Sequence, residues 1–152
     1  MHLAHYLGLA HEGELALADA FRQVSEAHKD EPDIWSLCRK LAKQCDQHAE
    51  QLAPFVARYG EEAPPEPERL HMERFGGTRQ GGLGLLRDLH DLYLMASDVD
   101  IAWTVINQAA QGARDTELFT TVSAIDKETA TQILWLRTRM KQAAPQALLV
   151  AT

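Results

Sequence analysis

The feature that most constrains the fold of this chain is an apolar repeat of helical period that recurs in four long runs. In the first run, Leu3–Lys29, inward-type positions recur at alternating steps of four and three residues. That spacing places them on one face of a helix, whereas a strand would alternate with a period of two. The other runs cover residues 33–59, 83–111 and 115–141. Four amphipathic helices of this length predict an all-α four-helix bundle.

The breaks between these helices predict how they are connected. Pro32 and its acidic neighbours begin the second helix after only a few residues, and Asp115 is a suitable N-cap soon after the third helix, so each break predicts a helical hairpin. Residues 60–82 are rich in proline and glycine, which prevents a long helix, although 68–75 can form one of two turns. A connector this long is explained if it crosses the whole bundle, about 40 Å.

The end of the chain raises a separate question. Pro145 is expected to lie just past the end of the fourth helix, because proline cannot continue the backbone hydrogen bonding. Beyond it, the segment 146–152 contains Leu148, Leu149 and Val150. We expect these apolar side chains to pack on the bundle or on a partner, with a frayed end as the alternative.

Composition narrows the class of protein. The chain has 152 residues, which suits a single domain over 1–152, and 45% hydrophobic with 24% charged residues is typical of soluble proteins. Its net charge of −7 argues against nucleic acid as a partner, and no apolar run approaches a membrane span of roughly 20 residues. Cys38 and Cys45 would lie about 10.5 Å apart on one helix, too far for a disulfide. With no secretory signal visible, we expect reduced thiols and a cytoplasmic protein.

The residues that stand out chemically lie on inward faces. In the run Cys45-Asp46-Gln47-His48, Cys45 and His48 fall on the apolar stripe, and Glu14 falls on the stripe of the first helix. One interpretation pairs Glu14 with His48 across the hairpin and treats the cysteine as a small core side chain. The other is a mononuclear metal site of Glu14, Cys45 and His48, with Asp126 as the fourth ligand, which would favour zinc.

The bundle plan together with the inward Glu14 and His48 resembles the ferritin-like superfamily. The resemblance implies an antiparallel four-helix bundle with a long crossover between helices 2 and 3. It also implies a di-iron site in which two helices each supply a Glu and the other two each supply a Glu-x-x-His. Glu14 matches the Glu of the first helix, and His48 is kept on the second. The remaining positions carry other residues: Cys45 on the second helix, Ala96 and Val99 on the third, and the run Asp126-Lys127-Glu128-Thr129 on the fourth.

We therefore expect a ferritin-like bundle without a working di-iron centre and without a bound cofactor, acting as a binding or assembly module. Its expected partner is a second copy, in a homo-oligomer, or another protein. The alternative is a metal-binding (iron or zinc), redox or iron-storage protein that uses the reduced ligand set. A role outside catalysis is favoured, and an enzyme built on this site would be a metal-dependent oxidoreductase.

Overall fold

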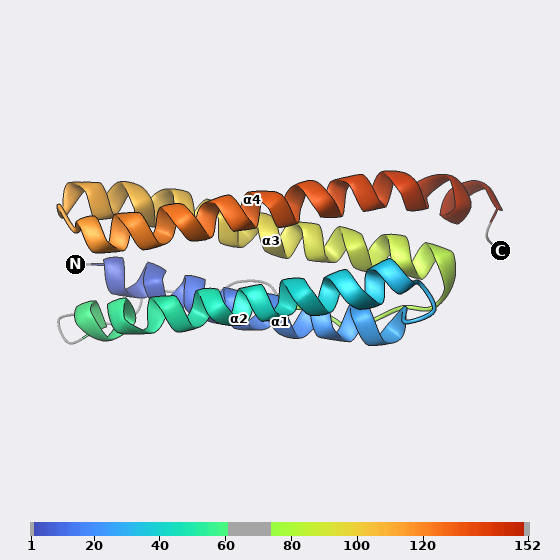
Figure 1. Ribbon diagram of the computed structural model, residues 1–152, viewed down its shortest axis with the longest axis horizontal. Helices are drawn as coiled ribbons and strands as arrows, with labels where there is room; N and C mark the ends of the chain where they lie inside the picture. The colour runs from blue at the N-terminus through green and yellow to red at the C-terminus, as the bar shows by residue number, and fades with distance from the viewer. Residues whose placement is uncertain (1, 61–73, 151–152) are drawn as a thin grey trace.

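Four long helices make up the fold of the computed structural model, which describes residues 2–60 and 74–150. They are α1 (Leu3–Ala27), α2 (Pro32–Gly60), α3 (Gly81–Gly112) and α4 (Thr116–Pro145), and a π-helical turn, η1 (Gln146–Val150), follows α4 (Figure 1). No strand occurs among the described residues. The prediction of an all-α chain with four helices is confirmed.

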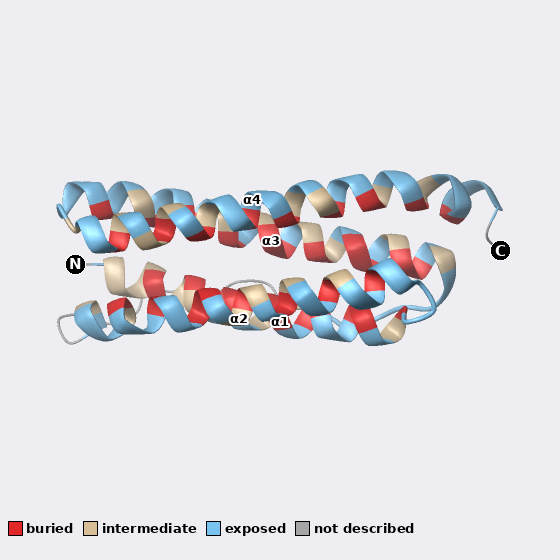
Figure 2. Cartoon of the chain, in the orientation of Figure 1, coloured by how far each residue is buried: buried red, intermediate tan, exposed pale blue. Residues whose placement is uncertain are grey.

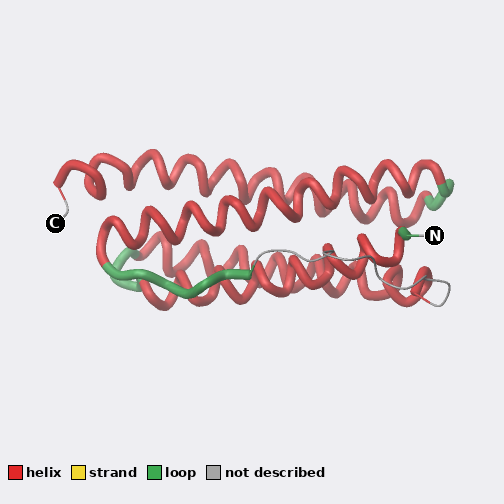
Figure 3. The backbone as a smooth tube through the Cα atoms, turned by 180° about the vertical axis from the view of Figure 1, so that it is seen from behind, coloured by secondary structure: helices red, strands yellow, loops and turns green. Residues whose placement is uncertain are grey.

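The helices are arranged as two hairpins that pack on each other. The chain reverses between α1 and α2 and again between α3 and α4, and α1 also packs on α3 while α2 packs on α4 (Figure 1). Helix α2 ends and α3 begins at opposite ends of the bundle, as a crossover requires (Figures 1 and 3). Most of the short helix expected at 68–75 lies outside the described residues, and Arg74 and Phe75 themselves belong to a loop.

The helix boundaries agree with the sequence predictions to within two residues, except at the end of α4. Asp115 caps α4 by accepting a hydrogen bond from the backbone N–H of Leu118, at 3.0 Å. Helix α3 begins at Gly81, inside the segment expected to be a connector. The prediction that α4 stops before Pro145 was wrong, because the helix includes this proline and continues into η1. A proline removes one backbone donor, and the backbone after it continues as the π-helical turn.

The apolar tail, which we define as Leu148, Leu149 and Val150, does not pack on the bundle. All three side chains are exposed, Leu149 to 84%, whereas Ala147 before them is buried. For these residues the expectation of packing on their own bundle was wrong.

The core fills the space between the two hairpins. Buried residues follow the inward faces of all four helices (Figure 2), and Trp103 and Phe21 are the largest fully buried side chains. Each large apolar side chain buried in this way contributes about 1.5–3 kcal/mol to the free energy of unfolding. Within the described residues, no helix is both long enough and apolar enough to cross a membrane.

A buried aspartate ties the last described part of the crossover to the bundle. Asp88 of α3 is fully buried and accepts hydrogen bonds from the His28 ring at 2.7 Å and from the Arg79 backbone N–H at 3.0 Å. The Arg79 guanidinium donates a further bond, at 2.8 Å, to the other carboxylate oxygen. Gly84 allows this approach, because a Cβ there would lie 2.8 Å from the Arg79 carbonyl carbon. We call this group the Asp88 clip.

Candidate functional site

The centre of the bundle holds the pair that the sequence predicted between Glu14 and His48. Glu14 projects from α1 and His48 from α2, and both are buried because they lie on the inward stripes of their helices. The ring Nδ1 of His48 lies 3.2 Å from Oε1 of Glu14. A carboxylate buried without such a partner would cost several kcal/mol, so the pair accounts for the acid's position in an apolar interior.

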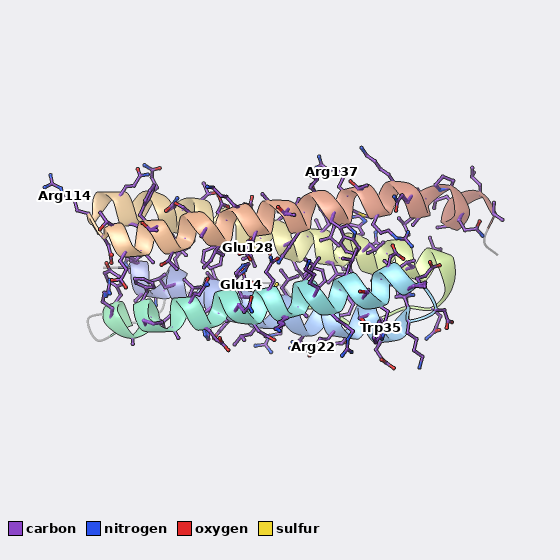
Figure 4. All side chains as sticks on the ribbon, in the orientation of Figure 1. Glu14, Arg22, Trp35, Arg114, Glu128 and Arg137 are labelled. Atoms are coloured by element: carbon purple, nitrogen blue, oxygen red, sulfur yellow. The ribbon has the colours of Figure 1, made fainter. Side chains whose placement is uncertain are left out.

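A second carboxylate, which sequence reasoning missed, completes the contacts of His48. Glu128 projects from α4 toward the middle of the bundle, near Glu14 (Figure 4). The ring Nε2 lies 2.9 Å from Oε2 of Glu128, and the Glu128 side chain is 47% exposed. Glu128 was overlooked because its helical position lies beside the inward Thr129 rather than on the stripe. The usable signal was side-chain length, since a glutamate at the edge of a helix can reach the interior while its stem stays at the surface.

This geometry determines the protonation of His48. Carboxylates accept hydrogen bonds only, so a ring placed between two of them satisfies both when each nitrogen carries a proton. Burial acts to lower the pKa of His48, but the hydrogen bonds and charges of Glu14, followed by those of Glu128, outweigh it and raise the pKa above its ordinary value. The two carboxylates therefore favour the imidazolium form of His48.

Cys45 lies beside this group and remains a thiol. It is fully buried, and the Gln132 amide nitrogen of α4 lies 3.6 Å from its sulfur. Burial, followed by the charge and hydrogen bonding of Glu14, raises the pKa of Cys45 well above its ordinary value. A protonated thiol is neither a strong nucleophile nor a metal ligand. Cys38, also free and buried, has its pKa raised to about 12, chiefly by burial.

The second carboxylate oxygen of Glu14 is less well satisfied than the first. Among the described residues no nitrogen or oxygen donates to the buried Oε2, while Oε1 is taken by His48. The nearby thiol of Cys45 is the group whose ionisation Glu14 opposes. A buried, unpaired carboxylate oxygen is the feature of this site that a cation or a proton would satisfy.

Helix α4 brings Glu128, rather than Asp126, to His48. The carboxyl of Asp126 instead lies within hydrogen-bonding reach of Asp100 on α3. Burial and then the hydrogen bond and charge of Asp126 raise the pKa of Asp100 to about 6. Of the four residues considered as metal ligands from the sequence, the structure thus brings Glu14, Cys45 and His48 together, while Asp126 faces a different helix.

The other inward positions at this level carry neutral side chains. Ala96 and Val99 of α3 are buried and apolar, and the Thr129 hydroxyl of α4 donates to the backbone carbonyl of Ile125 at 3.1 Å. Gln132 donates to Gln44 at 2.7 Å. Over residues 2–60 and 74–150, no group of three or more His, Cys, Asp and Glu side chains is placed to hold a metal ion.

Comparison with known protein families, with curated proteins and with solved structures finds no match. The class that fold and site define is an all-helical, four-helix protein with a histidine–carboxylate cluster at its centre.

Proposed function

We propose that this chain is a ferritin-like, antiparallel four-helix bundle that lacks a working di-iron centre and serves as a binding or assembly module. The order of connections supports the proposal: a hairpin, a long connection to the opposite end, and a second hairpin. Ferritin-like bundles have one such crossover.

The observation that carries the proposal is that both ring nitrogens of His48 are already engaged. Glu14 and Glu128 contact opposite edges of the ring, at 3.2 and 2.9 Å. A histidine that binds a metal needs one nitrogen with a free lone pair directed at the ion. His48 would have to lose a proton and one carboxylate partner to provide it. The two carboxylates therefore meet the hydrogen-bonding needs of the His48 ring without a metal ion.

The other ligand positions do not fit two iron ions. A di-iron site in such a bundle uses several carboxylates, which bridge the two ions, and imidazoles that complete their coordination. With the spacing of a Glu-x-x-His pair, α2 presents Cys45 and His48, and α4 presents Asp126, which lies beside Asp100 of α3, and the buried Thr129. Helix α3 presents Ala96 where a Glu is required. Of that ligand set, one buried Glu and one engaged His remain.

Elemental analysis tests this proposal. The full chain is purified without chelator, its metal content is measured, and its thermal stability is compared with and without added Fe²⁺ or Zn²⁺. We expect less than stoichiometric metal and an unchanged melting temperature. Stoichiometric metal that is lost in Cys45→Ala and His48→Ala, but kept in the exposed-histidine control His90→Ala, would overturn the proposal.

The second candidate function is a mononuclear zinc protein, and the unpartnered Oε2 of Glu14 favours it. Zinc would take that oxygen and the thiolate of Cys45, and Gln132 Oε1, 3.8 Å from the sulfur, is a further oxygen at the site. The raised pKa of Cys45 opposes this site, because the thiol must lose its proton. Titration with Co²⁺ decides, since a thiolate–cobalt absorption band that disappears in Cys45→Ser and persists in Cys38→Ser would establish the metal site.

A further inference from the structure

A groove lined by both apolar and charged side chains lies along the outer face of α3. It has a volume of about 540 Å³, lies between α3 and residues 74–76, and has Arg74, Asp91 and Asp98 as its charged lining residues. Its apolar lining is exposed at Ile101 (61%) and Leu94 and is continued by Met95 and Phe75. Exposed apolar surface gathered in a concave site is a common mark of a binding surface. We call this the α3 groove.

The apolar tail is a second exposed apolar surface, separate from the α3 groove. Leu148, Leu149 and Val150 follow one another in η1 and are exposed. Contacts of η1 with α3 and α4, and the burial of Ala147, hold the turn against the bundle. The three side chains therefore form a fixed apolar projection rather than an unstructured end.

The tail cannot reach the groove of its own chain. The pairs Tyr93–Arg137 and Asn107–Ser123 set the level at which α3 and α4 lie side by side. By that pairing Leu94 lies level with about residue 136 of α4, so Leu148 is about 12 residues, or about 18 Å, beyond it along the axis. Ile101 is about 28 Å away by the same measure. Within one copy, the tail and the groove remain separate.

We propose that the apolar tail of one copy occupies the α3 groove of a second copy, in a two-fold pair in which both tails are exchanged. The inference rests on the proposed assembly role and names its partner. Each copy carries one tail and one groove, so a two-fold dimer buries both tails in both grooves and leaves no surface free for a third copy. If the tail of one copy entered the groove of the next without exchange, each end would stay open and the copies would form chains. The groove volume falls in the range of sites that enclose ligands of several apolar groups.

Analytical ultracentrifugation of the full chain tests the pairing. The tail variant is Leu148→Ser/Leu149→Ser, the groove variant is Leu94→Ser/Ile101→Ser, and the matched control is Leu134→Ser, an α4 side chain that is 65% exposed and belongs to neither surface. We expect a dimer for the wild type and the control. Each double variant should dissociate about a hundredfold more readily, since it removes buried leucine-sized contacts.

Mixing the two double variants provides the decisive observation. Each variant alone has lost both tail–groove contacts, but a mixed pair recovers one, between the tail of the groove variant and the groove of the tail variant. We expect the mixture to pair more tightly than either variant by itself. A monomeric wild type, a dimer unaffected by the tail variant, or a mixture no tighter than its parts would each overturn the pairing. If the protein is a monomer without bound metal, the tail–groove pairing fails but the proposal that the bundle lacks a di-iron centre survives. The failure of one proposal can therefore be told apart from the failure of the other.

Discussion

Asp126 and Glu128 lie two positions apart on α4 and meet different helices. The carboxyl of Asp126 lies beside Asp100 of α3, whereas Oε2 of Glu128 lies 2.9 Å from the His48 ring of α2. Residues two apart on a helix project about 200° from each other, so one turn of α4 can contact α2 on one side and α3 on the other. Asp126 faces another carboxyl, whereas Glu128 faces the His48 ring. Neutralising Asp126 should therefore stabilise the fold, and neutralising Glu128 should destabilise it.

Removing the charge of Glu14 should destabilise the protein. Glu14→Gln keeps a side chain of similar shape but takes a carboxylate away from the His48 imidazolium, and we expect a loss of about 1–3 kcal/mol in the free energy of unfolding. Urea unfolding measures it. Glu12→Gln, on the exposed side of the same helix, is the control and should change stability by less than about 0.5 kcal/mol. An unchanged stability for Glu14→Gln would contradict the burial of this carboxylate.

The His48 ion pairs should make stability depend on pH. Because the pKa of His48 is raised in the folded state above its ordinary value of 6.5, the folded chain holds this proton more tightly than the unfolded chain. The stabilisation is fully present below pH 6.5 and is lost as the pH rises through the folded-state pKa, by up to about 1.4 kcal/mol per pH unit.

Unfolding measured at successive pH values between about 6 and 8.5 should show this decline in the wild type. In His48→Gln the slope should be smaller over the same range, whereas His90→Gln, which changes an exposed histidine, should keep it. Parallel curves for the wild type and His48→Gln would exclude the imidazolium.

Most of the fold could be predicted because the information is local. The spacing of apolar residues defined each helix, and Asp115 marked the start of α4 through a bond to the nearby Leu118. The end of α4 could not be predicted in this way. Whether Pro145 ends a helix depends on the backbone of the following turn, η1, and η1 contacts α3, which lies far away in the sequence.

The site was predictable only in part. Glu14 and His48 lie on inward faces of two helices joined by a short turn, so their meeting followed from periodicity and connection length. Glu128 required the relative level of α2 and α4, which no local pattern contains. Asp88 was overlooked although it lies three residues after Leu85 and four before Leu92, both of which belong to the apolar stripe.

The carboxyl pair of Asp100 and Asp126 should cost stability at neutral pH. The pKa of Asp100 is raised to about 6 by burial and by its neighbour, so the folded chain becomes less stable as the pH rises from about 4 to about 6 and Asp100 ionises. Asp126→Asn removes one charge and should raise the melting temperature at pH 7, with little effect at pH 4. Glu50→Gln, at an exposed position on α2, should leave the melting temperature unchanged at both pH values.

The Asp88 clip should be sensitive to the loss of its carboxylate. Asp88→Asn leaves the buried His28 and the Arg79 guanidinium without a shared anionic acceptor, and we expect a loss of about 3 kcal/mol in the free energy of unfolding. Asp91→Asn is the matched control, since it also removes a carboxylate paired with Arg79 but from a half-exposed position, and it should cost about 1 kcal/mol or less. Equal losses in the two variants would show that Asp88 does not hold the clip.

Gly84 should tolerate no side chain, because the crossover backbone occupies the space. A Cβ at this position would lie 2.8 Å from the Arg79 carbonyl carbon and 3.0 Å from its Cβ, so Gly84→Ala must push the loop away from Asp88. We expect this strain, about 1–3 kcal/mol, to exceed the gain of about 1 kcal/mol that alanine brings to a helix. Gly8→Ala on α1 would meet no atom within 4 Å, so it should instead raise the free energy of unfolding, by about 1 kcal/mol. Urea unfolding of the two variants should therefore show shifts of opposite sign, and a stabilised Gly84→Ala would contradict the contact between the crossover and α3.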